Sequence, residues 1–384
     1  MLAKLSSVFK SIYLFIVSFR SRTTYKKNKK VIFLLSFPST SRIIIEALYN
    51  EWGKKLVICY TPEATDLALE YARKGCEVYP IHSFKTLISH VIPLITGAKV
   101  ILCDNYFAFL SGIKSSKDRK VVQVWHANGA IKNFGLSAKY AKNRSKFDQK
   151  RYKEVYKMFT HYVVSSDKMK SVFERNYQLM VEVLPYGYPP TDNFLDNDWM
   201  SQKKATFRKK FPTTKKIMLY APTYREKKST KVSEFKTIVN NLQDEWLIFV
   251  KPHPHEMEEY QMLSEEESIV FDFKGLSLEE ILPSVDCLIT DYSSIPFEYS
   301  LANPQGKVIF YCYDFLEYEE IVGIENDFRD WAPGEIVYNE TNLLRAIQSN
   351  RHFSFERFNK EWNQFVTGAS RTQIIEWVRK HNEA

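Results

Sequence analysis

The chain of 384 residues is 45% hydrophobic and 15% aromatic, which supplies enough apolar side chains for folded cores and argues against disorder. At roughly 150 residues per domain, this length predicts two domains. Of the 54 basic residues, eight lie within residues 1–30, where no acidic residue occurs, and the remaining 46 nearly balance the 45 acidic residues. A protein that binds nucleic acid usually spreads its basic charge over a folded face, so we expect no nucleic-acid partner.

The spacing of the five cysteines supports neither a zinc site nor a redox site, because none form a Cys-x-x-Cys pair. All except Cys76 lie in or beside apolar, strand-like runs, where cysteine is usually a small buried hydrophobic residue. An odd number of cysteines in a long chain predicts no disulfide framework and favours a reducing, cytoplasmic setting.

Residues 1–30 have the pattern of an amphipathic, basic helix. The longest unbroken apolar run, Ile12–Val17, is far shorter than the roughly 20 residues that span a bilayer. A signal peptide would place its basic residues first, whereas the cluster Lys26–Lys30 follows the apolar part. We therefore predict a segment that lies in the interface of an anionic membrane, and the alternative is a helix packed on the protein's own surface. The apolar residues recur at steps of mostly three or four, at Leu2, Leu5, Val8, Ile12, Phe15, Ile16 and Phe19.

From residue 31 onward, short apolar strands alternate with helical segments. The first predicted strand, Val31–Ser36, precedes a helix over Ser39–Trp52, with Ser39 as its N-cap and Gly53 as its stop. A strand over Leu56–Tyr60 and a helix over Pro62–Lys74 follow. This alternation predicts a parallel sheet covered by helices, in an N-terminal, acceptor-side domain over residues 31–200. Its further strands are predicted at Val78–Pro80, Lys99–Cys103, Val121–Trp125, Tyr162–Ser165 and Val181–Leu184.

A polar, basic stretch from about Asp192 to Lys216 marks the expected domain boundary, and the pattern then restarts over residues 201–384. The end of the chain, Phe355–His381, is predicted to be mostly helical. The expected fold class is α/β, with two doubly wound Rossmann-like domains that face each other across a cleft. No Gly-x-Gly-x-x-Gly or P-loop pattern occurs. Strands of the second domain are predicted at Ile217–Tyr220, Trp246–Val250, Ile269–Phe271, Cys287–Thr290 and Val308–Tyr311.

Four polar clusters follow predicted strands, and ligands of open parallel sheets bind outside the carboxyl ends of the strands. Each cluster alone has a structural explanation, such as a buried histidine, a surface ion pair or a turn. Their common place at strand ends favours a functional site, because one cluster lies in the first domain and three in the second, so all can face one cleft. The clusters are Trp125–Lys132, Tyr220–Arg225, Lys251–His255 and Thr290–Ser294.

The residue types in these clusters suit the transfer of a phosphate group to a hydroxyl. A histidine side chain titrates near neutrality and can accept the proton of an attacking hydroxyl, and His126 suits that role. An anionic donor needs an arginine fork, other cations, and a helix N-terminus with free N–H groups. Asp291 can orient the site or hold Mg²⁺ with substrate phosphates, but no metal-ligand cluster stands out, so no cofactor is predicted. The candidate phosphate-binding residues are Arg225, Lys132, Lys251, His253, Ser293 and Ser294.

Together the clusters resemble the CDP-glycerol glycerophosphotransferase family of teichoic acid synthesis. The resemblance rests on Trp-His followed by a lysine, on Tyr-Ala-Pro-Thr-Tyr-Arg, on a short histidine segment and on Thr-Asp-Tyr-Ser-Ser, in this order. The last run continues into Phe297-Glu298-Tyr299, and a later strand ends in Tyr313-Asp314. The similarity covers about residues 98–330. It departs from the family at Ala127, where glycine is frequent, and at residues 128–131, which replace Thr-Pro-Leu.

The resemblance implies a GT-B-like fold, a CDP-activated donor bound mainly by the C-terminal domain, and a catalytic histidine at His126. It implies a second functional histidine at His253, near the donor phosphates. Trp125 and Thr223 belong to the matching motifs and are therefore expected to bind substrate.

Chain-elongating polymerases of this family tend to carry an additional large N-terminal region, whereas here only a short anchor segment precedes residue 31. The resemblance thus implies a primase that transfers glycerol phosphate from CDP-glycerol to N-acetylmannosaminyl-N-acetylglucosaminyl diphospho-undecaprenol and releases CMP. Such an enzyme would lie peripherally on the cytoplasmic face of the cell membrane, with other teichoic acid enzymes as further partners. The alternatives are a glycerol- or ribitol-phosphate polymerase, a GT-B sugar-nucleotide glycosyltransferase, and a non-catalytic membrane-binding protein.

Overall fold

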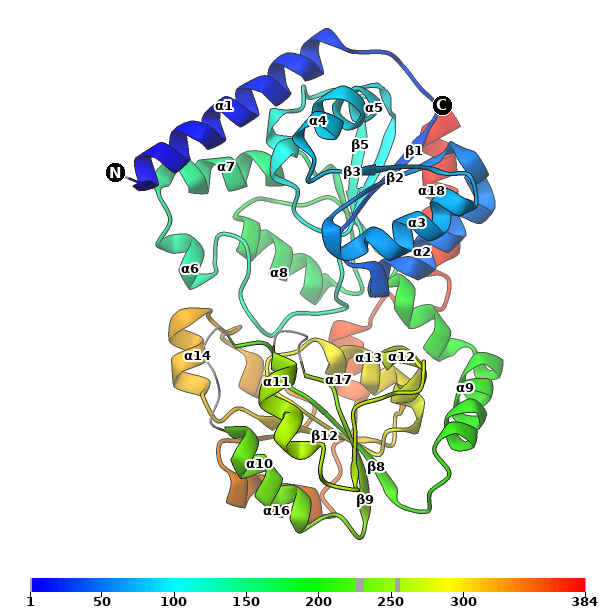
Figure 1. Ribbon diagram of the computed structural model, residues 1–384, viewed down its shortest axis with the longest axis vertical. Helices are drawn as coiled ribbons and strands as arrows, with labels where there is room; N and C mark the ends of the chain where they lie inside the picture. Colours follow the sequence, from blue (N-terminus) through cyan, green and yellow to red (C-terminus); the bar gives the residue numbers. More distant parts are fainter. Residues whose placement is uncertain (1, 226–230, 253–255, 384) are drawn as a thin grey trace. The chain divides into compact units, whose positions relative to one another are not determined.

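A computed structural model describes residues 2–225, 231–252 and 256–383, and the chain divides into two compact units (Figure 1). Unit 1 contains Met1–Asn128, Phe134–Asp192 and Phe365–Ala384. Unit 2 contains Gly129–Asn133 and Asn193–Gln364. The chain passes from unit 1 into the long second segment of unit 2 after Asp192, close to the predicted domain boundary at residue 200. The structure departs from the predicted division at the end of the chain, because the last twenty residues return to unit 1.

Unit 1 is built on a parallel sheet with the strand order β3-β2-β1-β4-β5-β6-β7. Its strands β1 and β4 are continuous apolar runs that are buried at every residue, as expected for a parallel sheet covered by helices. The strands are β1 (Val31–Leu35), β2 (Leu56–Tyr60), β3 (Glu77–Pro80), β4 (Val100–Cys103), β5 (Lys120–Gln123), β6 (His161–Val163) and β7 (Val183–Leu184).

The helices of unit 1 follow these strands in the alternation that the sequence predicts. One predicted cap is wrong: α2 begins at Pro38, whose fixed φ suits the first helical position, and Phe37 rather than Ser39 occupies the N-cap. The helices are α1 (Leu2–Thr23), α2 (Pro38–Trp52), α3 (Thr65–Arg73), α4 (Phe84–Thr86), α5 (Ile92–Gly97), α6 (Lys139–Lys142), α7 (Lys146–Tyr156), α8 (Asp167–Tyr177) and α18 (Ser370–Glu383).

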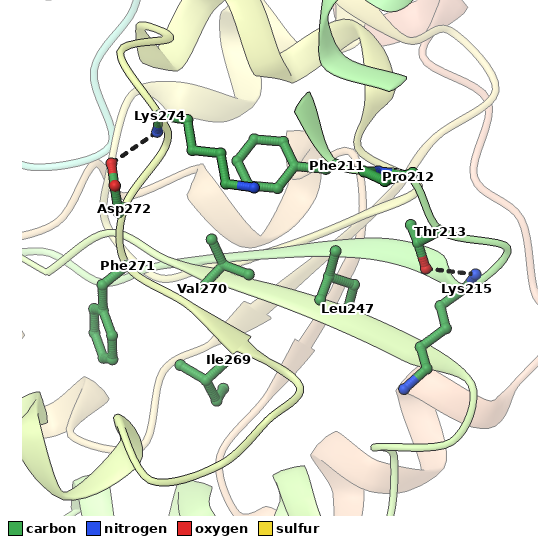
Figure 2. A pocket seen from close by; sticks show the side chains of 10 residues that line it. All are labelled: Phe211, Pro212, Thr213, Lys215, Leu247, Ile269, Val270, Phe271, Asp272 and Lys274. Atoms are coloured by element: carbon green, nitrogen blue, oxygen red, sulfur yellow. Dashed lines mark hydrogen bonds between the residues drawn. The ribbon is translucent and has the colours of Figure 1, made fainter. Parts of the chain in front are cut away.

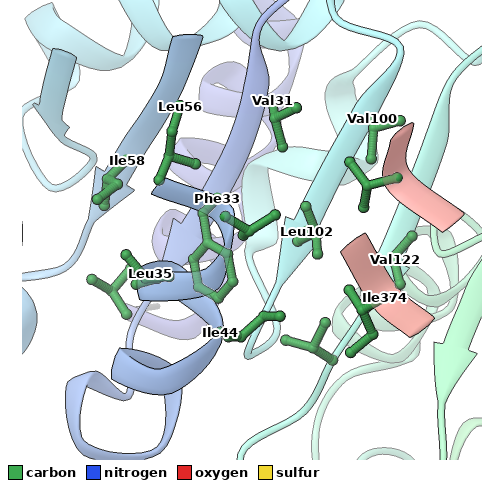
Figure 3. Close-up of a cluster of buried hydrophobic side chains, with 14 of the residues drawn as sticks. Val31, Phe33, Leu35, Ile44, Leu56, Ile58, Val100, Leu102, Val122 and Ile374 are labelled. Atoms are coloured by element: carbon green, nitrogen blue, oxygen red, sulfur yellow. The ribbon is translucent and has the colours of Figure 1, made fainter. Parts of the chain in front are cut away.

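The core of unit 1 lies between this sheet and helices from both ends of the chain (Figure 3). Phe33 and Leu102 on the central strands pack with Ile44 of α2 and Ile374 of α18. Full burial of one such side chain stabilises a fold by about 1.5–3 kcal/mol. The C-terminal helix is therefore part of the N-terminal core, which explains why the chain returns to unit 1.

The first helix, α1, packs against unit 1 through a narrow face. Val17 and Ser21 are fully buried, and Gly112 gives Val17 room, since a Cβ on Gly112 would lie 2.7 Å from Val17 Cγ1. Ser21 Oγ accepts a hydrogen bond from Lys114 N at 2.8 Å, and Arg20 Nε donates to Ile88 O at 3.0 Å. In the part of the chain that the structure describes, no helix has both the length and the hydropathy to cross a bilayer.

Unit 2 contains a second parallel sheet, with the order β10-β9-β8-β11-β12-β13. The last of these strands, β13, was not predicted, because it has only three residues, begins with a glutamate and is only partly buried at its first two positions. The strands are β8 (Lys216–Ala221), β9 (Trp246–Val250), β10 (Ile269–Val270), β11 (Cys287–Thr290), β12 (Lys307–Tyr311) and β13 (Glu335–Val337).

The polar stretch before β8, predicted as a boundary segment, folds largely into a helix, α9, whose start is capped by Asp196. The helices of unit 2 are α9 (Asn197–Lys210), α10 (Lys231–Asn240), α11 (Met257–Tyr260), α12 (Leu278–Ile281), α13 (Ile295–Ala302), α14 (Phe315–Ile321), α15 (Phe328–Trp331), α16 (Glu340–Gln348) and α17 (Glu356–Trp362). Two doubly wound parallel sheets thus confirm the predicted fold class.

Candidate active site

In unit 2, three neighbouring strands end beside one another and their following loops bring polar side chains together. The strands β8, β11 and β12 are adjacent and parallel, so their carboxyl ends share one edge of the sheet. Thr223 and Arg225 follow β8, Asp291 follows β11, and Asp314 follows β12. This edge is the ligand-binding position of open α/β sheets.

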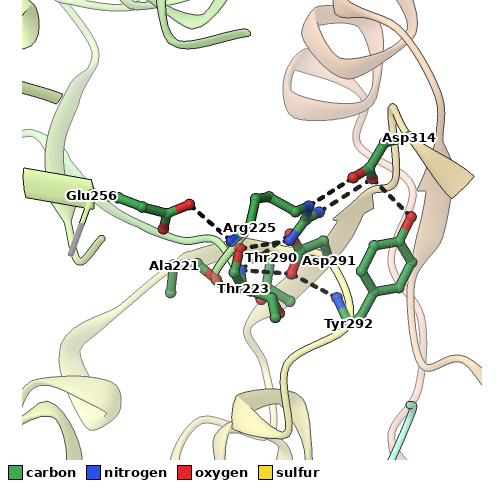
Figure 4. A network of polar contacts seen from close by, with 8 residues as sticks. All are labelled: Ala221, Thr223, Arg225, Glu256, Thr290, Asp291, Tyr292 and Asp314. Carbon is green, nitrogen blue, oxygen red and sulfur yellow. Dashed lines mark hydrogen bonds and ion pairs between the residues drawn. The ribbon is translucent and has the colours of Figure 1, made fainter. Parts of the chain in front are cut away.

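Arg225 is the centre of this network (Figure 4). Its Nε donates to Asp314 Oδ2 at 2.6 Å, and its Nη2 donates to Asp291 Oδ2 at 2.8 Å and Asp314 Oδ1 at 3.1 Å. Its Nη1 donates to the carbonyl oxygen of Thr223. Burial alone would lower the pKa of Arg225, but Asp291 and Asp314 outweigh it and raise that pKa. The fork that was predicted to bind phosphate oxygens is thus occupied by carboxylates of the protein.

The carboxylate of Asp291 ties the first two loops together. It is almost fully buried and accepts hydrogen bonds from Thr223 N at 2.9 Å and from Tyr292 N at 2.6 Å, in addition to Arg225. Thr290 Oγ1 donates to Ala221 O at 2.7 Å, which joins the last residues of β8 and β11. The loops after β8 and β11 are therefore held rigidly with respect to each other.

Two tyrosines, Tyr292 and Tyr318, pack against this network. Tyr292 Oη donates to Asp314 Oδ1 at 3.0 Å, and its ring stacks on Tyr318 at 3.9 Å. The Arg225 guanidinium lies 4.8 Å from the centre of the Tyr318 ring, within the range of a cation–π contact. Burial raises the pKa of Tyr292, so this phenol stays protonated and acts as a donor.

Lys132 belongs to the same unit and lies close enough to interact electrostatically with the network. An antiparallel bridge pairs it with Ile324, and its neighbour Asn133 donates from its N–H to Gly323 O at 2.9 Å. The side chain of Lys132 keeps an exposed surface, yet desolvation by the surrounding protein lowers its pKa; Asp291 opposes this shift and Arg225 adds to it. Its ammonium group is a cation available at this edge of the sheet.

The remaining predicted anion-binding residues of unit 2 lie at the same strand ends. Lys251 follows β9 with an exposed side chain, and its N–H donates to Tyr220 O at 2.9 Å. Ser293 and Ser294 precede α13, but its first turn contains Pro296, which has no N–H, and Ser293 Oγ accepts from Ile295 N at 3.3 Å. The helix start therefore offers fewer free N–H groups than predicted. His253 lies outside the described residues.

In unit 1, Trp125 and His126 follow β5. The strand ends at Gln123, two residues earlier than predicted, because Gln123 Oε1 accepts a hydrogen bond from Trp125 N at 2.9 Å and Trp125 adopts a left-handed φ of 62°. His126 Nδ1 lies 2.8 Å from the carbonyl oxygen of Asp104, and its ring stacks on Phe37 at 3.8 Å. A carbonyl oxygen only accepts, so the proton of neutral His126 is on Nδ1 and its basic lone pair is on Nε2.

Asp104 and Gln123 are buried polar residues that the motif search missed. The Asp104 carboxylate accepts from Ser36 N at 2.9 Å, from Phe37 N at 2.8 Å and from Ser41 Oγ at 2.8 Å. Burial raises the pKa of Asp104 to about 6, although these hydrogen bonds lower it. Both residues stand at the carboxyl ends of strands, β4 and β5, and that position was the signal that could have found them.

The structure thus brings Thr223, Arg225, Asp291 and Lys132 together in unit 2, and it places Trp125 with His126 in unit 1. Neither cluster has a protein nucleophile held by a base. The histidine of unit 1, with its fixed basic nitrogen, suits the acceptance of a proton, and the cations and hydroxyls of unit 2 suit the binding of a phosphate group. Among the described residues, no three histidine, cysteine, aspartate or glutamate side chains gather closely enough to hold a metal ion.

A pocket of about 470 Å³ lies elsewhere in unit 2 (Figure 2). It is lined by the segment after α9, including Phe211 and Lys215, and by residues of β9 and β10, including Leu247 and Ile269. The pocket adjoins the start of β9 at Leu247, both residues of β10, and the segment that follows β10. It contains none of the predicted site residues, and we do not assign the chemistry to it.

Known proteins resemble this chain over most of its length. The model of the family described as CDP-Glycerol:Poly(glycerophosphate) glycerophosphotransferase matches residues 16–380. The teichoic acid glycerol-phosphate primase of Bacillus subtilis is 31% identical over 363 residues, which cover 92% of each chain. The teichoic acid poly(ribitol-phosphate) polymerase of Bacillus spizizenii is 27% identical over 294 residues, which cover 73% of this chain and 46% of the polymerase.

Among solved structures, that of the wall teichoic acid polymerase TagF superposes with a TM-score of 0.74. The match covers 99% of this chain and 97% of the other at 16% sequence identity. This likeness shows the fold, and the predicted GT-B-like fold is confirmed.

Proposed function

Because the chain belongs to the CDP-glycerol:poly(glycerophosphate) glycerophosphotransferase family, we propose that it is a teichoic acid glycerol-phosphate primase. It transfers glycerol phosphate from CDP-glycerol to N-acetylmannosaminyl-N-acetylglucosaminyl diphospho-undecaprenol and releases CMP. The observation that carries this proposal is the 31% identity to a primase over 92% of the chain.

The proposed reaction begins with the acceptor hydroxyl. His126 Nε2 takes its proton while the hydroxyl oxygen attacks the phosphorus that bears glycerol. The bond from this phosphorus to the bridging oxygen breaks, and CMP leaves with the electron pair. The hydrogen bond from Nδ1 to Asp104 O supports this role, because it orients the ring and stabilises the imidazolium that forms.

The donor diphosphate is proposed to bind at the strand ends of unit 2. Lys132 and Lys251 supply positive charge, and Thr223, Ser293 and Ser294 supply hydroxyl donors. Thr223 Oγ1 is buried and makes no hydrogen bond to any described residue, so its hydroxyl can donate to an oxygen of a bound ligand. Arg225 acts as a brace that holds the loops of Thr223, Asp291 and Asp314 in place. Trp125 packs beside His126 and lines the acceptor side, and His253 remains a predicted donor-phosphate residue.

The lipid-linked acceptor requires the enzyme to work at a membrane surface, and α1 suits this requirement. Phe15 and Phe19 on α1 are 71% and 61% exposed, and with Val8 and Ile12 they form an apolar stripe in solvent. The buried residues of the helix, Val17 and Ser21, project from its opposite face. We therefore propose peripheral association of α1 with the anionic, cytoplasmic face of the cell membrane.

The test is CMP release from CDP-glycerol in the presence of a soluble analogue of the disaccharide-diphosphate lipid, with the product mass measured alongside. The primase adds one glycerol phosphate unit. A ladder of products would instead support a polymerase, the second candidate, which the 27% identity to a polymerase over 73% of this chain favours. Absence of CMP with folded protein and acceptor present would contradict both.

A further inference from the structure

Helix α7 lies beside α1 in unit 1 (Figure 1), and polar contacts join the two helices. Arg151 Nη2 donates to Ser7 O at 2.8 Å and to Ser11 Oγ at 2.7 Å. Lys10 Nζ forms a salt bridge of 3.0 Å with Asp148, which also pairs with Arg151. These contacts hold α1 and α7 as one rigid pair.

The position of these contacts on α1 shows where α7 lies relative to the apolar stripe. Successive residues of a helix are about 100° apart. Ser7 and Ser11, which contact α7, each precede by one residue the stripe residues Val8 and Ile12. The buried residue Val17 projects from the other side of the serines. Lys10, which pairs with Asp148 of α7, lies nearly opposite the stripe, so α7 packs between the stripe and the buried face of α1 and does not lie beneath the stripe.

The free surface of α7 carries one aromatic side chain and several lysines. Phe147 is 70% exposed and stands one turn before Arg151, so it lies on the flank of α7 that borders α1. Val155 and Tyr156 face the core of unit 1. The exposed lysines of this helix and its continuation are Lys146, Lys150, Lys153 and Lys157.

The charge of this region is strongly positive. Residues 139–157 contain eight basic and two acidic residues. Both acidic residues are already paired, Asp148 with Lys10 and Arg151, and Glu154 with Lys157. A basic surface with an exposed phenylalanine, next to an apolar stripe, matches an anionic lipid surface, in which aromatic rings enter the interface and lysines meet the headgroups.

We propose that α7 is a second membrane-contacting element of this protein. Phe147 enters the lipid interface beside the α1 stripe, and Lys146 and Lys150 contact anionic headgroups. The partner is a bilayer that contains anionic lipid. This inference rests on the proposed membrane association of α1, and it extends the contact surface beyond residues 1–30.

The test is co-sedimentation of the full-length protein with vesicles of phosphatidylcholine containing about one third phosphatidylglycerol. The variant carries Lys146→Ala, Lys150→Ala and Phe147→Ala, and its expected partition coefficient is at least tenfold lower than that of the parent. Alanine preserves the helix. The matched control carries Arg208→Ala, Lys209→Ala and Leu316→Ala, which remove the same charge and an exposed apolar side chain from unit 2, and it is expected to bind like the parent.

A second variant, Phe15→Ala with Phe19→Ala, separates this inference from the proposal on which it rests. Loss of binding in this α1 variant but parental binding in the α7 variant would overturn the role of α7 and leave the membrane proposal intact. Parental binding in both would overturn both. CMP release with the soluble acceptor analogue is expected to be unchanged in all variants, which shows that they are folded.

Discussion

At the scale of single residues, Arg225 is held by two carboxylates and a carbonyl oxygen of three different loops. A guanidinium used in this way positions loops, because its bonds join its own loop after β8 to the loops after β11 and β12. This geometry explains how one side chain shapes the loops after β8, β11 and β12.

Replacing Arg225 by lysine tests this role. An ammonium group has three donors but lacks the planar fork that binds Asp314 twice and Asp291 at the same time, so hydrogen bonds to these buried carboxylates are lost. We expect a lower thermal midpoint and a fall of at least about tenfold in kcat/KM for CDP-glycerol. The control Arg329→Lys, at an exposed arginine of α15 that forms no ion pair with a carboxylate among the described residues, keeps both values near those of the parent. An unchanged thermal midpoint for Arg225→Lys would contradict the role of Arg225 in holding these loops together.

We propose that Asp104 positions His126, the proposed base, because its carbonyl oxygen lies 2.8 Å from His126 Nδ1, and Asp104→Asn tests this role. The amide keeps the size of the side chain but cannot accept all the bonds from Ser36, Phe37 and Ser41. The expected result is a fall in kcat of about tenfold or more with little change in KM for CDP-glycerol, because the base is displaced while the donor site is intact. A raised KM with unchanged kcat would argue against this role.

The same variant has a predicted pH dependence. The folded protein raises the pKa of Asp104 from 3.8 to about 6, so the folded state binds this proton more tightly than the unfolded state. The contribution of this group to stability is therefore full below pH 3.8 and decreases as the pH rises to about 6. Asparagine does not ionise at this position. The free energy of unfolding, measured with urea, is therefore expected to differ less between the parent and Asp104→Asn as the pH rises from 3.8 to about 6. A difference in free energy of unfolding that grows as the pH rises would contradict the raised pKa of Asp104.

Sequence alone located several site candidates, because a polar residue directly after an apolar strand is a strong signal. Thr223, Arg225 and Asp291 follow strands and belong to recognisable motifs. The partners of Arg225 could not be read in this way, since its bonds to Asp314 and Asp291 join segments far apart in the chain. Asp104 follows a strand as clearly but belongs to no motif, so only its hydrogen bonds reveal it.

At the scale of elements, the strands of both sheets were well predicted except β13, and the predicted start of α2 was wrong. Predicted strands such as Leu56–Tyr60 and Trp246–Val250 agree with the structure to the residue, because long buried runs are unambiguous. The start of α2 depends on a carboxylate from β4, and β13 is short and half-buried. Both depend on tertiary contacts that a local pattern does not contain.

Gly129→Ala tests the packing of the segment that carries Lys132. A Cβ at Gly129 would lie 2.4 Å from a ring carbon of Phe297, which is fully buried against Trp362. The ring cannot move without disturbing its neighbours, so overpacking is expected to cost about 1–3 kcal/mol, or a fall of several degrees in thermal midpoint. The exposed substitution Leu316→Ala in the same unit is the control. A midpoint equal to that of the control would show that this contact relaxes freely.

At the scale of the whole molecule, the last helix, α18, belongs to unit 1 although the chain before it belongs to unit 2. The terminal helices were predicted within the C-terminal domain, yet α18 packs its Ile374, Trp377 and Val378 into the core of unit 1. A local helical pattern indicates that α18 has an apolar face but not which sheet this face covers. The membership of α18 therefore follows only from the structure.

Ile374→Ala tests this membership. The cavity is expected to destabilise unit 1 by about 2–5 kcal/mol, and Ile375→Ala, at a less buried neighbouring position, by less. Hydrogen exchange should accelerate in β1 and β4 of unit 1, while β8 and β11 of unit 2 keep their protection. Faster exchange in unit 2 instead would place the helix with the second sheet.

The central claim, a glycerol-phosphate primase that uses His126 as its base, is tested most directly by one assay. CMP release and product mass are measured with CDP-glycerol and the soluble acceptor analogue for the parent, His126→Ala and His82→Ala, an exposed histidine of the same unit. We predict one added glycerol phosphate for the parent and for His82→Ala, and at least a hundredfold slower CMP release for a folded His126→Ala. Parental turnover by His126→Ala would remove this histidine from the reaction, and a ladder of longer products from the parent would contradict the primase.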